Sequence, residues 1–599
     1  MKNRWIFLCF WMVVIASCNK DEDITTFNPQ PPKIALDSEN SIYKAKVGRE
    51  VTIAPVYENI AGAIYTWKID GQITSTDSVF RYTFEENGEY FVTIEATTRY
   101  GSKSEEAKVE VSDLAPPVIS LVVPPAGLDV VAGKQYLLEP DVQNADSTTL
   151  FSWKINGVEV GNEKDFTFCA QELGEYEVSF YAENGDGNDT KIFQVNALER
   201  IPVKIVFPAP MYGLYDEEVI KYVSLGRTIY LRPYLFDEVE PRFQWKLDGI
   251  GLPGATSQIF AFKPEATGEY SLSLTVTDKD ESVNESSAKI TSNITRKKEY
   301  ETTIGIKVVC CEREGYYQRT SSGSNSAGIQ EVLEFVAAPG QFVNEHYQVS
   351  SLAEAKAFAR ESLNKGTYVS LGGFGGYIIV SFDHSIDNVE GQYNFSVLGN
   401  QFEGSSEPGV VWVSQDVNGN GLPDDEWYEL KGSEYGLSCT KQFYAVTYYR
   451  PEGTGMNVPW KDNYGKTGSV DYLKQFHSQS YYYPNWIKEN SYTLFGSCLE
   501  ARNYQDDGKA EENGSSEYWV NPSYEWGYVD NYGSDMIAGT SWVGFKISNA
   551  VNPDGSSANL KYVDFVKVVN GLNTKSGWLG EVSTEVVGFN DENINKTGK

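Results

Sequence analysis

The stretch DVNGNGLPDDEW, residues 416 to 427, carries side-chain oxygens at alternate positions, followed by a glycine and further carboxylates. EF-type calcium loops place oxygen ligands at positions 1, 3, 5, 7 and 9, with a glycine at position 6 where the chain turns sharply. Counted from Asp416, position 6 is Gly421 and position 7 offers a backbone carbonyl. The spacing predicts a Ca²⁺ site with the ligands Asp416, Asn418, Asn420, Leu422, Asp424 and Glu426.

The end of this loop departs from the EF pattern. Position 12 is Trp427 in place of a bidentate Glu, which leaves Asp425 or Glu426 to complete the shell. The flanking runs 410–413 and 427–430 have the composition of strands and not of helices. The alternative to a calcium site is therefore a rigid polar turn. In both cases we expect the loop to join two strands and to leave ligand contact to other residues.

Aromatic side chains form a second group that could bind a ligand. Between Thr440 and Asp535 there are fourteen Tyr and four Trp, several of them consecutive. Consecutive aromatics cannot all face one core, and Tyr and Trp suit binding surfaces because a large apolar ring carries a polar edge. The alternative is that they pack this segment onto the rest of its domain. The predicted ligand-binding residues are Trp460, Tyr481, Tyr482, Tyr483, Trp486, Trp519, Trp526, Tyr528 and His477.

Catalytic motifs are missing from the sequence. The chain has three histidines, no HExxH and no GxSxG, and the glycine-rich run 369–382 continues into a β-branched strand without the Gly-Lys-Ser/Thr of a phosphate loop. Carboxylates are abundant, but a glycosidase pair depends on a spatial separation that sequence does not give. We expect a binding protein and not an enzyme. Nucleic acid is excluded as a partner, because a formal charge of −33 would repel phosphates.

The N-terminus has the pattern of an export signal. Lys2 and Arg4 precede an apolar run that ends in Ile15-Ala16-Ser17-Cys18, and an acidic run follows. This resembles a bacterial lipobox, which implies a signal peptide at 1–17, lipidation of Cys18 and an acidic linker at 18–31. The acidic run is similar to the signal that sends Bacteroidetes lipoproteins to the extracellular face of the outer membrane. We therefore expect a lipid-anchored protein at the cell surface.

The cysteines do not have the spacing of a disulfide framework or a zinc site. Apart from Cys18 and Cys9 of the signal peptide, an odd number remains, and one pair such as Cys439 with Cys498 stays open as a disulfide. The remaining residues are Cys169, Cys310, Cys311, Cys439 and Cys498.

Three repeats precede the region that carries these candidate sites. Trp67, Trp153 and Trp245 each begin a Trp-Lys-x-Asp/Asn-Gly motif, and a Gly-Glu-Tyr motif places a Tyr 23, 23 and 25 residues later. Alternating apolar residues around them predict three immunoglobulin-like sandwiches, with Trp in the core and Tyr at a corner. The repeats resemble PKD-type domains of bacterial surface proteins, which implies a stalk. The predicted bounds are 32–113, 114–198 and 199–297.

The remainder, 298–599, lacks the repeat motif. Residues 351–364 predict a helix that ends before Gly366, and a series of alternating runs on both sides of a long insertion, about 439–540, predicts one jelly-roll-like β-sandwich. The chain as a whole is thus expected to be mainly β.

Four stretches of this C-terminal domain carry a family resemblance: 407–413, 416–430, 526–531 and 579–586. Together with the lipobox and the repeats, they resemble the surface lipoproteins of the BtuH type that Bacteroidetes encode beside vitamin B12 transporters. The resemblance implies capture of cobalamin and its transfer to a TonB-dependent outer-membrane transporter. A glycan-binding lipoprotein and an adhesin remain open, since the same aromatic surface suits a sugar and the sandwich faces suit a protein.

Overall fold

The computed structural model of this chain describes residues 30–38, 40–124, 126–214, 218–279, 299–345, 348–473, 477, 479–513 and 517–597. The predicted signal peptide, Cys18 and most of the linker lie outside these residues. The chain divides into two compact units, Met1–Pro116 and Pro117–Lys599, which are described separately below. As predicted, it is mainly β, with tandem immunoglobulin-like sandwiches followed by a further β domain. None of the described helices has the length and apolar character needed to cross a membrane.

The first unit is one sandwich. Its main sheet has the order β2-β9-β8-β5-β6, and the pairs β1-β4 and β3-β7 make up the opposite layer. The strands are β1 Lys33–Ala35, β2 Ile42–Lys46, β3 Glu50–Ile53, β4 Val56–Glu58, β5 Ile64–Ile69, β6 Gln72–Ser75, β7 Phe80–Thr83, β8 Gly88–Thr98 and β9 Gly101–Ser112.

The second unit begins with two sandwiches of the same plan, with the sheet orders β11-β18-β17-β14-β15 and β20-β27-β26-β23-β24. In the second repeat the strands are β10 Val118–Ser120, β11 Leu128–Val131, β12 Tyr136–Leu138, β13 Asp141–Gln143, β14 Leu150–Ile155, β15 Val158–Gly161, β16 Phe166–Phe168, β17 Gly174–Asn184 and β18 Gly187–Leu198. In the third they are β19 Lys204–Val206, β20 Val219–Leu225, β21 Ile229–Leu231, β22 Tyr234–Phe236, β23 Arg242–Leu247, β24 Ile250–Gly251, β25 Phe260–Phe262, β26 Gly268–Lys279 and β27 Glu299–Arg313.

The repeated Trp and Tyr have the positions expected for them. All three Trp side chains are fully buried, and each indole N–H donates to a backbone carbonyl 10 to 12 residues later: Trp67 to Asp77, Trp153 to Glu163 and Trp245 to Ser257. Each Tyr hydroxyl donates to the carbonyl four residues before it: Tyr90 to Glu86, Tyr176 to Glu172 and Tyr270 to Ala266. In each repeat the Trp ring in the core is thereby hydrogen-bonded to the segment that follows its own strand. The Tyr hydroxyl holds the turn that leads into the strand on which the Tyr lies.

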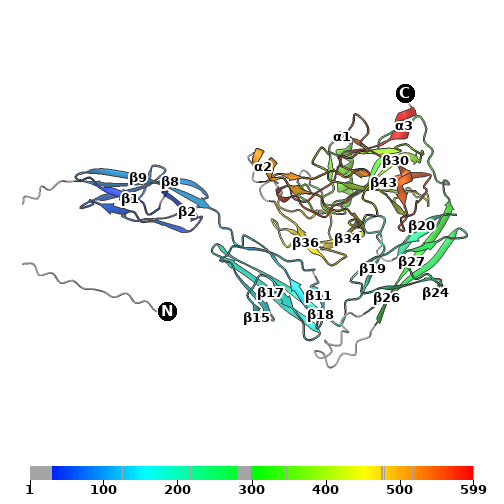
Figure 1. Ribbon diagram of the computed structural model, residues 1–599, viewed down its shortest axis with the longest axis horizontal. Helices are drawn as coiled ribbons and strands as arrows, with labels where there is room; N and C mark the ends of the chain where they lie inside the picture. Colours follow the sequence, from blue (N-terminus) through cyan, green and yellow to red (C-terminus); the bar gives the residue numbers. More distant parts are fainter. Residues whose placement is uncertain are drawn as a thin grey trace, which may run out of the picture. The chain divides into compact units, whose positions relative to one another are not determined.

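The third repeat is longer than predicted. We expected it to end at 297, but β27 pairs with β26 from Glu299 to Cys310 and with the parallel strand β20 as far as Arg313, so this sandwich extends to Arg313 (Figure 1). The boundary was misplaced because the residues between the two strands, 280–298, carry no alternating apolar pattern.

The C-terminal domain is built on a seven-stranded antiparallel sheet with the order β28-β30-β43-β32-β33-β42, on which β40 also pairs with β32. A three-stranded sheet, β41-β31-β45, and the pair β29-β44 accompany it. The strands are β28 Glu331–Val336, β29 Val369–Ser370, β30 Tyr377–Asp387, β31 Phe395–Leu398, β32 Gly409–Ser414, β33 Trp427–Leu430, β40 Tyr528–Val529, β41 Trp542–Phe545, β42 Ala550–Val551, β43 Tyr562–Asn570, β44 Glu585–Val586 and β45 Gly588–Asp591, with a last helix α3 Glu592–Thr597.

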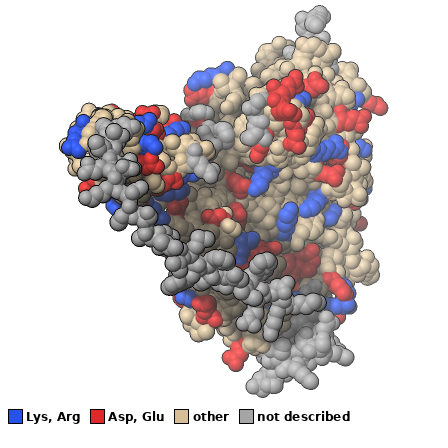
Figure 2. Space-filling model, turned by 60° about the vertical axis from the view of Figure 1, so that its left-hand side comes forward, with Lys and Arg blue, Asp and Glu red and all other residues tan. Residues whose placement is uncertain are grey.

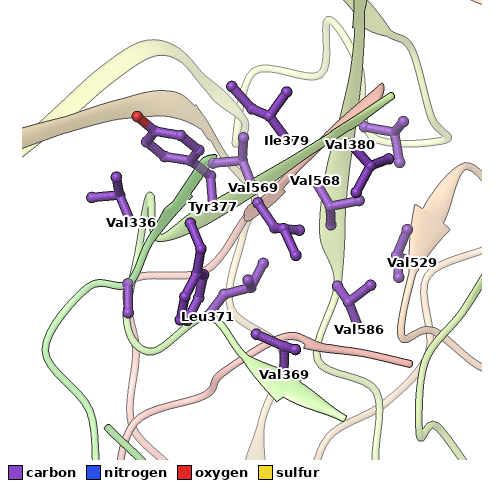
Figure 3. Close-up of a cluster of buried hydrophobic side chains, with 14 of the residues drawn as sticks. Val336, Val369, Leu371, Tyr377, Ile379, Val380, Val529, Val568, Val569 and Val586 are labelled. Atoms are coloured by element: carbon purple, nitrogen blue, oxygen red, sulfur yellow. The ribbon is translucent and has the colours of Figure 1, made fainter. Parts of the chain in front are cut away.

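Branched aliphatic side chains fill the core of this domain. Val369, Leu371, Val529 and Val586 come from short strands and loops, and meet Val568 and other residues of the large sheet (Figure 3). The predicted helix is confirmed as α1, Leu352–Lys365: Ser351 caps its N-terminus by accepting the N–H of Glu354, and Gly366 ends it in the left-handed conformation.

The predicted insertion, about 439–540, forms a sheet of its own over residues 441–498, with the order β36-β35-β34-β37, but its last part differs from the prediction because β40 belongs to the large sheet. Its elements are β34 Lys441–Tyr449, β35 Val458–Asp462, β36 Thr467–Val470, β37 Ser491–Cys498, β38 Tyr504–Gln505, α2 Asp507–Asn513 and β39 Trp519–Val520. The five described cysteines are unpaired, including the pair left open from the sequence: Cys439 is exposed and Cys498 is buried.

Candidate functional site

An open groove of about 1010 Å³ lies beside the insertion sheet, within the second compact unit. One wall is formed by β34, β37 and the hairpin between β35 and β36. The other wall comes from the second and third repeats, through Pro124, Ala126, Lys204 and residues 236–238. Its lining mixes aromatic rings with amides, hydroxyls and charges of both signs; among these are Tyr449, Asn463, Tyr464, Asn490, Ser491 and Thr493.

The hairpin that carries Tyr464 is fixed by Asp462. One carboxylate oxygen of Asp462 accepts the backbone N–H groups of Tyr464 and Lys466 at 3.0 and 2.7 Å, and the other accepts the hydroxyl of Tyr444 at 2.9 Å. Gly465, at φ 84°, completes the turn. The Tyr464 side chain, 62% exposed, is therefore presented from a rigid turn, with its ring 6.0 Å from that of Tyr444.

Polar contacts join the walls of the groove. Lys461 of the hairpin lies 3.6 Å from Asp237 of the third repeat. Outside the groove, two contacts join the second repeat to the insertion: the amide of Gln143 donates to Asn457 at 3.2 Å, and Lys191 forms an ion pair with Glu452. The groove is thus bounded by repeats as well as by the C-terminal domain.

Most of the aromatic residues predicted to bind ligand lie elsewhere. Trp460, Tyr482, Tyr483, Trp486 and Tyr528 are 7%, 1%, 0%, 2% and 1% exposed and pack in the core. For Tyr482 and Tyr483 the expectation of an exposed surface fails because residues 481–483 form an irregular segment and not a strand, so neighbouring rings need not alternate. Trp460 and Tyr528 lie on the strands β35 and β40 with their side chains in the core. Their hydroxyls find partners inside: Tyr482 accepts from Leu473 N–H, Tyr483 donates to the Glu489 carbonyl and Tyr528 accepts from Glu434 N–H.

The other four predicted residues are partly exposed, and none lines the groove. Tyr481 accepts a hydrogen bond from Arg450, and the Trp519 indole donates to Glu517. Trp526 is also partly exposed, and its backbone carbonyl accepts the Ser433 N–H. His477 has both ring nitrogens within hydrogen-bond distance of protein oxygens, 2.9 Å from Glu345 and 2.7 Å from Gln341. Metal ligation by this imidazole would require it to break one of these contacts.

The loop 416–427 connects β32 and β33, as expected of a strand connection. The carboxylate of Asp416 accepts the N–H groups of Gly419, Asn420 and Gly421 at 2.8 to 3.1 Å. The side-chain amides of Asn418 and Asn420 donate to Asp424 at 3.0 and 2.8 Å. These bonds tie Asp416, Asn418, Asn420 and Asp424 into one folded loop, as in a self-supporting polar turn, and a cation would have to compete with the amide donors for these oxygens.

The acids of this loop are crowded and desolvated. Burial raises the pKa of Asp416, and burial together with Asp424 and Asp416 raises the pKa of Asp425 well above its usual range. Glu426, predicted as a calcium ligand, instead pairs with Lys221 of the third repeat at 2.8 Å. The loop is also bonded to the large sheet, because Asp564 on β43 accepts the backbone N–H of Asp416 at 2.9 Å.

A different group of acids meets the geometric condition for a metal site. Among the described residues, the carboxylates of Glu407, Asp530 and Glu585 have oxygens that all lie within 4.8 Å of one another. Burial raises the pKa of Glu407 to about 7 and places those of Asp530 and Glu585 well above their usual values. Asp530 accepts backbone N–H groups from Asn400 and Glu585 at 2.9 and 2.8 Å. The three acids lie in three of the stretches that carry the family resemblance, 407–413, 526–531 and 579–586. Their proximity was not predicted from the sequence.

His384 shows no catalytic geometry. It is 1% exposed on β30, and its two ring nitrogens each lie 2.6 Å from a carboxylate, of Asp383 and of Asp591. A histidine held at both nitrogens inside the core joins β30 to β45 and has a structural role.

The family comparison matches two of the three repeats. Residues 31–98 and 116–184 match the model of the PKD-like domain, in agreement with the predicted PKD-like repeats. Domains of this surface type fit an adhesin or a binding protein. No curated protein matches the sequence.

Similar solved structures are tandem arrays of β domains. The fibronectin(III)-like modules of Clostridium thermocellum CbhA are 15% identical, with 28% of this chain and 94% of theirs covered and a TM-score of 0.19. An I-band fragment of titin is 12% identical over 47% and 99%, with a TM-score of 0.21. The three N-terminal domains of the outer capsid protein Hoc of bacteriophage RB49 are 15% identical over 47% and 100%, with a TM-score of 0.22. TM-scores this low support no conclusion about function.

Proposed function

We propose that this protein is a cell-surface lipoprotein, anchored through Cys18 on the extracellular face of the outer membrane, that captures a corrinoid and passes it to a TonB-dependent transporter. The observation that carries the proposal is the groove of about 1010 Å³. Ligand sites commonly measure about 300 to 1,000 Å³, so this groove is of the size that a large small-molecule ligand needs.

The lining of the groove suits this ligand class. A corrinoid is broad, partly apolar and rimmed by amides. Tyr449 and Tyr464 offer rings, while Asn463, Asn490 and Thr493 offer hydrogen-bond donors and acceptors for amide groups. The resemblance of four stretches of the C-terminal domain to BtuH-type lipoproteins supports the same ligand.

Titration of the purified protein with cyanocobalamin, followed by calorimetry, tests this function. We expect saturable binding, weakened at least tenfold by Tyr464→Ala. The matched control is Tyr532→Ala, which removes a 45% exposed ring that does not line the groove. The absence of heat with the unchanged protein at micromolar concentrations would overturn corrinoid capture.

A glycan is the second candidate, and the exposed ring of Tyr464 favours it. A flat aromatic face on a rigid turn is a stacking platform for a sugar. A glycan array probed with the unchanged protein and with Tyr464→Ala separates the two: a signal that depends on Tyr464, with no cobalamin binding, would assign the groove to a glycan. An array and a titration that both fail would leave protein adhesion through the sandwiches.

Calcium at the loop 416–427 belongs to the same proposal, as a structural ion. The ligands would be Asp416, Asn418, Asn420, the Leu422 carbonyl and Asp424, with Asp425 in place of Glu426. An ion that binds only the folded state raises the melting temperature. We expect Ca²⁺ to raise it relative to EGTA, and Asp424→Ala to abolish the shift. An identical melting temperature with ion and chelator would contradict a calcium site.

A further inference from the structure

A cavity of about 140 Å³, partly open to solvent, lies between the third repeat and the C-terminal domain, within the second compact unit. The third repeat contributes residues 207–210 and the strands β21 and β22. The C-terminal domain contributes one face of β43, β32 and β33, and the insertion sheet contributes β34 and β37. This cavity is separate from the groove, with which it shares no lining residue.

The floor of the cavity is a row of three side chains on neighbouring strands. In the register of the large sheet, Trp412 on β32 is opposite Lys567 on β43 and opposite Glu429 on β33. Directly opposed residues point to the same face of a sheet, and so does Trp427, two residues before Glu429. A lysine, a carboxyl group and two indoles therefore face the same space.

Hydrogen-bond donors in this lining have no partner. The indole N–H groups of Trp412 and Trp427 and the Nε–H of Arg232 are buried, and none makes a hydrogen bond among the described residues. Buried donors are nearly always satisfied, and leaving one unpaired costs about 1 to 3 kcal/mol. Three such donors around one cavity point to acceptor atoms that belong there.

Two cations line the same space. One carboxyl group whose charge acts on Lys567 is Glu334, which does not line the cavity and accepts the Tyr377 hydroxyl at 2.7 Å. Within the described part of the chain, neither Lys567 nor Arg232 forms an ion pair; the Lys567 ammonium lies 4.0 Å from the ring centre of Tyr377, and the Arg232 guanidinium lies 3.7 Å from that of Phe443. Burial lowers the pKa of Lys567 to about 8 and also lowers that of Arg232.

The acids around the cavity are occupied or inclined to stay neutral. Glu429 accepts a hydrogen bond from Ser497 at 2.6 Å, and burial raises its pKa to about 7. Glu426 pairs with Lys221 at 2.8 Å. Tyr234 is buried, and burial raises its pKa. Among the described residues, none of these groups forms an ion pair with Lys567 or Arg232.

We propose that this cavity binds a small aromatic carboxylate, whose carboxylate pairs with Lys567 and Arg232 and accepts the indole N–H groups of Trp412 and Trp427. The ring would lie against Phe443 and Phe495, which also line the cavity. A cavity of about 150 Å³ accommodates a benzene ring, so the ligand has roughly ten non-hydrogen atoms or fewer. The site is independent of corrinoid capture in the groove.

Benzoate and its neutral analogue benzamide test the proposal on the full chain. Calorimetry is expected to give saturable binding of benzoate and at least tenfold weaker binding of benzamide, and quenching of tryptophan fluorescence reports occupancy beside Trp412 and Trp427. Equal affinity for the two compounds, or no binding of benzoate at millimolar concentration, would overturn it.

Substitutions locate the binding. Lys567→Met keeps the length of the side chain and removes the charge, and Arg232→Gln removes the second cation; each is expected to weaken benzoate binding at least tenfold. Trp427→Phe removes one donor and is expected to cost severalfold. Lys561→Met changes an exposed lysine outside the cavity and should have no effect. Unchanged affinity in both Lys567→Met and Arg232→Gln would place benzoate elsewhere and refute the site.

Two controls address misfolding of a variant and overlap with the groove. Should Lys567→Met fail to give a folded protein by circular dichroism, the Arg232→Gln and Trp427→Phe variants still distinguish the site. Tyr464→Ala, which is expected to weaken corrinoid binding in the groove, should leave benzoate binding unchanged. A parallel loss of both ligands in Tyr464→Ala would show one shared site and contradict a separate cavity.

Discussion

The repeats and the C-terminal domain are both β structures, but they bury different kinds of side chain. Each repeat is organised around one Trp whose N–H is bonded, with a core that is almost wholly apolar. The C-terminal domain buries many acids. Its buried acids include Asp416, Asp424, Asp425, Glu429, Glu434, Asp462, Asp530, Asp535, Asp564, Glu581, Glu585 and Asp591. On the molecular face shown in Figure 2, exposed Lys and Arg side chains are interspersed with exposed Asp and Glu side chains.

This difference in buried charge indicates which parts of the chain have a supporting role and which carry candidate binding sites. Burying a charge destabilises a fold unless the charge is paired or hydrogen-bonded, so a domain selected only for stability would avoid it. Clusters of such groups therefore mark positions where a ligand, an ion or a specific contact is expected. The first two repeats show no such cluster among their described residues, which agrees with a role as a stalk. The C-terminal domain contains the loop and the three-acid cluster, and the cavity lies between this domain and the third repeat.

The largest effect should come from the core of a repeat. Trp67→Ala removes a fully buried side chain from the first unit, and such substitutions cost about 3 to 5 kcal/mol. We expect the first repeat to unfold at a much lower temperature while the second unit, Pro117–Lys599, melts as before. Differential scanning calorimetry of the full chain measures both transitions. A shift of both together would mean that the two units are not independent.

The second effect is a dependence on pH that belongs to the C-terminal domain. Burial raises the pKa of Glu429 to about 7 and that of Glu581 to about 8, while an unfolded Glu titrates near about 4.3. The folded state therefore binds more protons between these values, and the free energy of unfolding falls as pH rises from about 4.5 to about 7 or 8. Each pKa unit corresponds to about 1.4 kcal/mol, so a loss of more than about 1 kcal/mol per group is expected.

The first repeat provides the contrast in the same calorimetric series. Lys33 lowers the pKa of Glu58 through a hydrogen bond and an ion pair, so the contribution of Glu58 is lost as pH falls and not as it rises. Glu429→Gln keeps an acceptor for Ser497 and should flatten the pH dependence of the second unit. If the two units lost stability in parallel between pH 4.5 and 7, the buried carboxyl groups would not be its cause.

The repeats could be predicted almost completely from sequence because their contacts are local. The Trp N–H partner lies 10 to 12 residues along the chain, the Tyr partner lies four residues back, and Asp70-Gly71 forms the tight turn with both φ angles positive, 45° and 85°. Because the motifs that make these local contacts recur in all three repeats, the contacts recur with them. The exception is β27, whose pairing spans a long connection without a pattern.

The sites of the C-terminal domain could not be predicted in this way. Glu407, Asp530 and Glu585 are separated by more than fifty residues at each step, and only the strand order brings them together. For the cavity one signal was present: Lys567 is the single cation in the otherwise apolar and acidic run 562–569, which is unusual for a central strand. The groove residues Tyr449 and Tyr464 lie in the aromatic segment singled out from sequence, but only the fold shows that they line the groove, that Tyr464 is exposed, and that Tyr482 and Tyr483 are in the core.

A smaller effect should come from the three-acid cluster. In chelator at pH 8, Glu585→Gln removes one of three neighbouring buried carboxylates, so we expect stabilisation of about 1 kcal/mol or more. At pH 5, where the raised pKa values keep these groups protonated, the same variant should have nearly no effect. Denaturant unfolding at the two pH values measures the difference. Destabilisation at pH 8 would indicate that the cluster is satisfied by other contacts of Glu585.

The smallest effect concerns the corner tyrosines. Tyr90→Phe keeps the ring and removes only the hydroxyl that donates to the Glu86 carbonyl at 3.0 Å, and one such hydrogen bond contributes about 1 kcal/mol. Because Tyr176 makes the same bond to Glu172, Tyr176→Phe should cost about as much, but in the second unit. Tyr82→Phe, which alters a 37% exposed ring of the first repeat, is the control. Calorimetry that resolves the two units should show each loss only in the unit that carries the substitution, since a hydrogen bond to a neighbouring turn acts within one sandwich.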